Sequence, residues 1–149
     1  MSVLYVAFKG NGNSANKIVR NLNGDKLFLT NSYSGLKKDI DNINGTYDFV
    51  YMFGLDKSLK GNVRIDCLAQ RGDVCLESDM DYGSIAMKLN KNGIITDIGN
   101  TPTQSLCNDA YWHMLRKFNC HVIFLHVPSI KYITDNFIEK VRTVFIKVL

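Results

Sequence analysis

The stretch VLYVAFKGNGNSANKIVRNL, residues 3–22, indicates the fold class on its own. Its first six residues form an apolar run typical of a buried strand, and the Gly/Asn/Ser-rich segment 9–14 predicts a turn. Residues 15–22 then carry apolar side chains at a helical spacing. The stretch therefore predicts a strand, a loop and a helix, which together form the repeating unit of α/β proteins.

The same alternation continues along the chain. Further strands are predicted over residues 27–29, 47–53, 63–69, 94–98 and 120–127, and helices over residues 84–89, 105–118 and 135–149. We also expect a helix over residues 34–43 with Ser34 as its N-cap, a loop or short hairpin over residues 70–82, and a polar turn over residues 99–104. This order predicts a three-layer α/β/α sandwich around a mostly parallel, twisted sheet.

Composition predicts a single domain over residues 1–149. The chain is 46% hydrophobic and 21% charged, a balance typical of globular domains, and it shows no repeat or linker. No apolar run approaches the roughly 18 residues of a membrane span, and the start MSVLYVAFKG does not resemble a secretory leader. The four cysteines have no metal or disulfide spacing, so we expect reduced thiols in a cytoplasmic protein without a membrane partner.

Several partners and cofactors are not expected. The net charge of +4 is spread without a run of five like charges, which argues against nucleic acid. The three histidines form neither HxH nor HxxxH, so we predict no metal site. The sequence contains neither GxGxxG nor GxxxxGK[ST], which argues against a bound nucleotide, and no other cofactor is indicated.

Cys107 and His126 are the residues whose predicted positions suggest chemistry. Cys107 falls in the first turn of a predicted helix that follows a strand, and His126 lies near the end of the next strand. In a parallel α/β sheet, strand C-termini and the helix N-termini that follow them share one edge, so both side chains are expected in one crevice. A helix N-terminus and a neighbouring imidazolium would lower the pKa of the thiol, and free N–H groups there could hold an oxyanion.

Asp66 is the candidate for an acid that orients the imidazole. It alternates with apolar residues in the strand predicted over 63–69, which places that strand at an edge or beside a cleft. An acid there either faces solvent or is buried with a partner. Spacing alone indicates catalysis only weakly, because free cysteines are usually buried and inert. We therefore interpret the remaining thiols as buried and unreactive: Cys67, Cys75 and Cys120.

Two segments resemble motifs of the pyroglutamyl peptidases, cysteine peptidases that are also called pyrrolidone-carboxylate peptidases. PTQSLCN at residues 102–108 is similar to the family's AGTYLCN, which aligns Cys107 with the nucleophile. FLHVP at residues 124–128 is similar to FIHVP, which aligns His126 with the base. A weaker likeness to the stretch ERVAIN aligns Asp66 with the family's acid. The resemblance covers most of the chain.

The resemblance implies an α/β/α cysteine peptidase that needs no cofactor and acts on a peptide or small amide. Cys107 would attack the amide carbonyl, His126 would transfer the proton and Asp66 would orient His126. The product would be a released N-terminal, pyroglutamyl-like residue, formed through an acyl-enzyme that water resolves. The resemblance leaves open whether identical subunits associate.

The implied substrate-binding positions are Phe8, Asn11, Ser105 and Leu106. Family members pack aromatic residues on the pyrrolidone ring, and Phe8 keeps one of them. Asn11 and Ser105 stand where two more are expected, and Thr103 replaces the glycine of the nucleophile motif. Asp66 is one methylene shorter than the family's Glu.

Two functions remain open at this point. One is an active amide hydrolase of the pyroglutamyl-peptidase type. The other is a catalytically inactive, divergent member that keeps the fold for binding or assembly, because a fold does not determine a function. We expect rapid alkylation of Cys107 near neutral pH in the first case and slow alkylation in the second.

Overall fold

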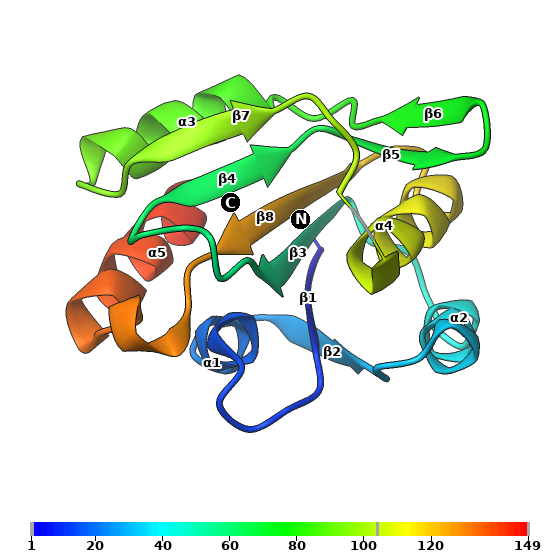
Figure 1. The fold of residues 1–149 in the computed structure, drawn as a ribbon, viewed down its shortest axis with the longest axis horizontal. Coiled ribbons are helices and arrows are strands. Elements are labelled where there is room, and N and C mark those ends of the chain that lie inside the picture. Colours follow the sequence, from blue (N-terminus) through cyan, green and yellow to red (C-terminus); the bar gives the residue numbers. More distant parts are fainter. Residues whose placement is uncertain (1, 104, 149) are drawn as a thin grey trace.

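The computed structural model describes residues 2–103 and 105–148, with side chains up to residue 146. The central sheet has the strand order β2-β1-β3-β8-β4-β7 (Figure 1). Its strands are β1 (Val3–Phe8), β2 (Asp25–Leu29), β3 (Phe49–Leu55), β4 (Val63–Asp66), β7 (Thr96–Gly99) and β8 (Val122–Val127). A separate hairpin consists of β5 (Leu68–Arg71) and β6 (Val74–Glu77). The helices are α1 (Ser14–Arg20), α2 (Tyr33–Asp41), α3 (Tyr82–Lys91), α4 (Ser105–Lys117) and α5 (Asp135–Val148), with a short 3-10 helix, η1 (Ile130–Tyr132).

Helices cover both faces of the sheet and form two cores. One core joins the sheet to α1, α3 and α5, and the other joins it to α2 and α4, as Figure 1 shows. All six residues of β1 are buried, and because successive side chains point to opposite faces, Tyr5 contributes to the first core and Val6 to the second. The predicted three-layer α/β architecture is confirmed.

The sheet is mostly parallel, as expected, but two strands are reversed. β1, β2, β3 and β8 run in one direction, whereas β4 pairs antiparallel with β8 and parallel with β7. In this register Arg64 lies opposite His126, and Asp66 lies opposite Phe124. The strand predicted over residues 63–69 was expected either at an edge of the sheet or beside a cleft. Because β4 lies between β8 and β7, it is not an edge strand.

Two local predictions differ from the structure. The side chain of Ser32, not Ser34, accepts the hydrogen bond from Gly35 N that caps α2. The strand predicted over 63–69 is two strands, because the chain leaves the main sheet after Asp66 and then forms the β5–β6 hairpin. The hairpin alternative for residues 70–82 is thus the correct one. Residue 104 of the predicted polar turn and residue 149 of the last helix lie outside the described residues.

No helix in the described part of the chain has both the length and the apolar character needed to cross a membrane.

Candidate active site

His126 and Asp66 form a buried pair between adjacent strands. His126 is on β8 and is 3% exposed, and Asp66 at the end of β4 is 2% exposed. A short hydrogen bond joins His126 Nδ1 to Asp66 Oδ2. Because the two residues are diagonal neighbours in the strand register, a carboxylate as short as that of aspartate reaches the ring. The ring also stacks on Phe124, with centroids 4.7 Å apart and an interplanar angle of 23°, so its orientation is fixed from two sides.

Arg64 holds the other oxygen of the acid. Its Nε donates to Asp66 Oδ1 at 2.9 Å, and its Nη1 donates to Asp56 Oδ2 at 2.8 Å. Partial burial of Asp56 opposes ionisation, but hydrogen bonds from Ser58 and Arg64 outweigh it and lower the pKa of Asp56 to about 2. One guanidinium therefore bridges two carboxylates. Neither Arg64 nor Asp56 was predicted from the sequence to belong to the site.

The thiol of Cys107 lies over the sheet next to His126. Gly54 is the β3 partner of His126 in the register, and a Cβ atom placed on Gly54 would lie 3.3 Å from Cys107 Sγ and 2.7 Å from the ring of Phe124. Glycine at this position leaves the space that the thiol occupies. The hydrogen bond of His126 among the described residues goes to Asp66, and none joins its ring to the thiol.

The route by which Cys107 reaches this place differs from the expected one. The strand before its helix, β7, runs opposite to β8 and ends at Gly99, which lies beside Asp66 in the register. Residues 100–103 then lead towards the start of α4, and Pro102 and Thr103 line a cavity that Cys107 and His126 also line. The crossing segment, not a shared parallel edge, brings Cys107 and His126 together.

The side chains of Asn108 and Tyr111 anchor α4. The Asn108 side chain accepts from Gln70 N at 3.0 Å and donates to Gln70 O at 2.7 Å, which ties the first turn of α4 to β5. One turn further on, the hydroxyl of the fully buried Tyr111 donates to the backbone oxygen of Asp66 at 2.8 Å. Both contacts fix the helix that carries Cys107 relative to the strand that carries the acid.

The thiol is held in its protonated form. Burial raises the pKa of Cys107 to about 11, and the carboxylates of Asp66 and Asp56 act in the same direction, against a smaller opposite effect of Arg64. This direction is opposite to the lowered pKa that was expected, because removal from water and the two nearby carboxylates both disfavour the thiolate. A thiolate at this site has to be generated by transfer of the proton to a base.

Two cavities meet at Cys107. The larger, of about 440 Å³, is lined by Leu55, Asp56, Lys57, Arg64, Thr101, Pro102, Thr103, Cys107 and His126. The smaller, of about 150 Å³, is lined by Phe8, Asn13, Asn31, Leu55, Leu106 and Cys107. Cys107 therefore has a cavity lined by charged side chains on one side and a cavity without charged side chains on the other.

The structure separates the four positions proposed for substrate binding. Phe8 and Leu106 line the smaller cavity beside the thiol. Asn11 is exposed in the turn before α1, and Ser105 is exposed at the start of α4, and neither lines the two cavities. Asn13 and Asn31 were not predicted as substrate-binding residues, but both line the smaller cavity.

The histidines outside this site have acidic partners of their own. His113 Nε2 lies 3.4 Å from Asp109 Oδ2, and His121 Nδ1 lies 3.1 Å from Asp79 Oδ1. Within residues 2–103 and 105–148, no group of three or more His, Cys, Asp or Glu side chains has the arrangement of a metal site. The chemistry that the described residues offer is that of a thiol, an imidazole and a carboxylate.

No protein-family model matches the sequence, and the search of curated proteins gives no match. Solved structures do match. The pyrrolidone carboxyl peptidase of Fervidobacterium islandicum AW-1 is 17% identical with a TM-score of 0.80, and the alignment covers 99% of this chain and 98% of that chain. The enzyme of the same name from Thermus thermophilus is 16% identical with a TM-score of 0.81, over 96% and 98% of the two chains.

The pyroglutamyl peptidase I of Bacillus amyloliquefaciens is 14% identical with a TM-score of 0.75, over 97% of this chain and 92% of that chain. At these identities the likeness establishes the fold. The chain has the fold of the pyroglutamyl peptidases, as the two short motifs led us to expect.

Proposed function

We propose that this chain is a cysteine-type amide hydrolase that removes a pyroglutamyl-like residue from the N-terminus of a peptide or from a small amide. The observation that carries the proposal is the buried Asp66–His126 hydrogen bond next to a cavity that His126 shares with Cys107. The likeness in fold to peptidases of this substrate class supports it.

The first step follows from the state of the thiol. Since the raised pKa keeps Cys107 protonated, its proton must move as the bond to the substrate forms. Asp66 engages His126 Nδ1, which leaves Nε2 to accept that proton. The sulfur then attacks the amide carbon, and the carbonyl oxygen takes up the negative charge. Backbone N–H groups in the first turn of α4 have no partner within the helix and can stabilise this oxyanion.

The second half of the reaction uses the same histidine. The imidazolium returns its proton to the amide nitrogen, the C–N bond breaks, and the amine leaves while the acyl group stays on sulfur as a thioester. Water attacks the thioester with His126 again as base, and this releases the acid and restores the thiol. No further proton source is required.

The position of His126 determines the orientation in which the substrate binds. His126 must reach the nitrogen of the leaving amine, so the leaving peptide occupies the larger cavity that His126 lines. The acyl group then occupies the smaller cavity, between Phe8 and Leu106. Apart from the thiol, the side chains that line this cavity are apolar or amides, which suits an uncharged ring and disfavours a free N-terminal ammonium.

The test is hydrolysis of a pyroglutamyl fluorogenic amide beside alanyl and prolyl amides of the same reporter. We expect turnover of the pyroglutamyl compound by the wild-type protein, loss in Cys107→Ser and His126→Ala, and retention in Cys75→Ser, which removes an exposed thiol. Turnover that persists in Cys107→Ser would show that the nucleophile is misassigned.

The second candidate is a catalytically inactive protein that binds the same ligands. The raised pKa of Cys107 and the missing hydrogen bond between its thiol and His126 favour it. In that case none of the amides is hydrolysed, and the wild-type protein and Cys107→Ser bind a pyroglutamyl peptide with equal Kd. Cleavage by the wild-type protein excludes this candidate.

A further inference from the structure

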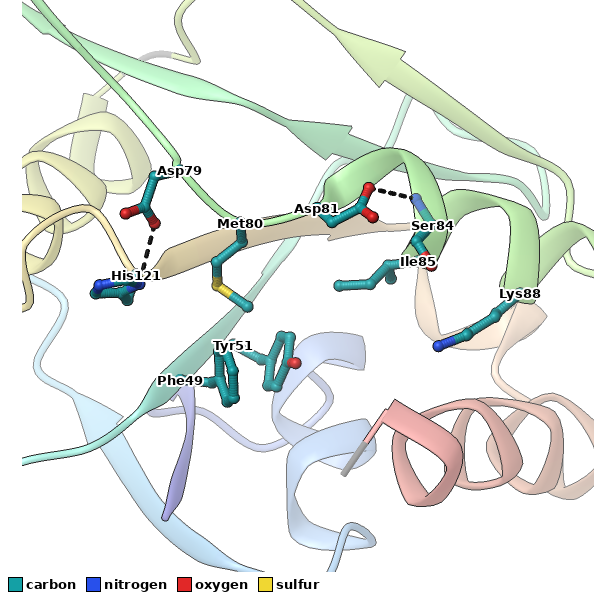
Figure 2. Close-up of a pocket in the computed structure, with 9 residues that line it drawn as sticks. All are labelled: Phe49, Tyr51, Asp79, Met80, Asp81, Ser84, Ile85, Lys88 and His121. Atoms are coloured by element: carbon teal, nitrogen blue, oxygen red, sulfur yellow. Dashed lines mark hydrogen bonds and ion pairs between the residues drawn. The ribbon is translucent and has the colours of Figure 1, made fainter. Parts of the chain in front are cut away.

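A third cavity, of about 340 Å³, is drawn in Figure 2 and lies at the other end of β3 from the two cavities at Cys107. Phe49, the first residue of β3, lines it, whereas Leu55 at the other end of β3 lines the candidate active site. A strand rises about 3.3 Å per residue, so this cavity and those at Cys107 are roughly 20 Å apart. This third cavity takes no part in the proposed hydrolysis, and a ligand could bind in it whether or not the protein is a hydrolase.

Three apolar side chains form one part of the wall of this cavity, beside charged and polar residues. Phe49, Met80 and Ile85 point into it from β3, the segment before α3 and α3 itself (Figure 2). Its volume falls at the lower end of the range of small-molecule sites, about 300–1,000 Å³, which combine mostly apolar walls with a few polar groups. The cavity is therefore suited to a small ligand with a hydrocarbon body.

Tyr51 supplies a buried polar group. Its side chain is 2% exposed, lines the cavity and accepts or donates no hydrogen bond within the part of the chain that the structure describes. Burial, with a smaller effect of the neighbouring Tyr5, raises the pKa of Tyr51 to about 12, so the hydroxyl keeps its proton. A hydroxyl that faces the cavity and has no protein partner can donate a hydrogen bond to an acceptor on a ligand.

Lys88 supplies a positive charge. It is half-buried on α3, and its side chain extends across the cavity towards Tyr51 in Figure 2. Among residues 2–103 and 105–146, no carboxylate lies within ion-pair distance of its ammonium. A hydroxyl donor and an unpaired ammonium that face the same apolar space are complementary to a carboxylate.

The acids of this cavity are engaged elsewhere. Asp79 Oδ1 lies 3.1 Å from His121 Nδ1, and Asp81 Oδ1 accepts from Ser84 N at 3.0 Å as the N-cap of α3, as the dashed lines in Figure 2 show. These contacts account for one oxygen of each carboxylate, and no ion pair joins either acid to Lys88 among the described residues. The positive end of the cavity is thus available to an anionic group.

We propose that this cavity binds a small apolar carboxylic acid. Its carboxylate contacts Lys88 and the Tyr51 hydroxyl, and its hydrocarbon body packs between Phe49, Met80 and Ile85. An aryl-propionic acid has the required size and polarity and serves as the probe.

The test is a titration of the full chain with 3-phenylpropionate, followed by amide chemical shifts in NMR spectra. We expect saturable shifts at the residues that line the cavity, with a Kd below about 10 mM. Lys88→Met is expected to weaken binding about tenfold or more, and Tyr51→Phe several-fold, since each removes one donor to a charged group. Lys91→Met on the same helix and Tyr5→Phe, whose ring stacks on Tyr51, are matched controls and should stay within about twofold of wild type.

The neutral 3-phenylpropionamide is the matched ligand and is expected to bind about tenfold more weakly than the acid. Three results would overturn the proposal: no saturable shift at the cavity, equal binding of acid and amide, or unchanged binding in both Lys88→Met and Tyr51→Phe. Tyr51→Phe keeps the buried ring, so we expect this variant to fold. An NMR spectrum of each variant without ligand, compared with that of the wild-type protein, checks that the fold is kept.

Discussion

At the scale of single residues, the state of the Cys107 thiol has a direct chemical consequence. The thiolate is the reactive form, and burial beside two carboxylates raises the pKa of this thiol to about 11. Alkylation of Cys107 by iodoacetamide should therefore be slow at pH 7 in an active hydrolase as well as in an inactive protein, so its rate does not separate the two functions. The rate should rise roughly tenfold per pH unit below the pKa. Mass spectrometry of each cysteine peptide measures this, with the exposed Cys75 as internal reference. Faster labelling of Cys107 than of Cys75 at pH 7 would contradict the raised pKa.

Arg64 and Asp66 are expected to act on the rate and not on substrate binding. Asp66→Asn should lower kcat by about 10⁴ if the acid sets the tautomer of His126. Arg64→Met should give a smaller loss in kcat with little change in KM, because it frees the acid that Arg64 holds at 2.9 Å. Arg64→Lys should recover part of the loss, since an ammonium can still contact one carboxylate. Steady-state kinetics on the pyroglutamyl reporter separate kcat from KM, and an Arg64→Met effect confined to KM would refute this role.

At the scale of elements, the contact between β3 and α4 depends on Gly54. Because a Cβ atom there would lie 2.7 Å from the Phe124 ring in the middle of the sheet, Gly54→Ala should destabilise the protein by about 1–3 kcal/mol. Gly83→Ala in the first turn of α3 is the control: the nearest atom to its added Cβ is 3.7 Å away, and helix propensity favours alanine. Urea unfolding measures both variants, and equal stability of Gly54→Ala and wild type would mean that the packing adjusts.

The elements also show where sequence reasoning succeeds and where it fails. The bounds of β1 were predicted correctly because a strand buried on both faces reads as one continuous apolar run. The reversal of β4 and β7 could not be predicted, since side-chain alternation is the same in either strand direction. Without that reversal Arg64 cannot be placed opposite His126, which is why its contact with the acid was missed. The thiol pKa was misjudged for a related reason, because burial is set by segments distant in sequence.

At the scale of the whole molecule, the bridge from Asp56 through Arg64 to Asp66 ties the chain after β3 to β4 and makes stability depend on pH. The folded pKa of Asp56 is about 2, below its ordinary value of 3.8, so its contribution is present above about pH 4 and is lost as the pH falls towards 2. The Asp56 side chain is 24% exposed, and after allowance for solvent screening we expect about 1–2 kcal/mol.

Urea unfolding between pH 2 and pH 7 tests this contribution. Asp56→Asn should be less stable than wild type at pH 7 and should lose less stability on acidification. Asp41→Asn removes an exposed i,i+4 pair with Lys37 and is expected to change little. Identical pH slopes for wild type and Asp56→Asn would show that the bridge contributes nothing measurable.

The antiparallel pairing of β4 with β8 also governs when the candidate site can come into being. Asp66 and His126 are 60 positions apart, and closing so long a loop carries an entropic penalty before any contact offsets it. During synthesis, a ribosome must add the strand that begins at Val122 before an imidazole can meet the acid at all. A nascent or partly folded chain thus lacks the pair of Asp66 and His126, and the proposed hydrolysis requires that assembly of the sheet be complete.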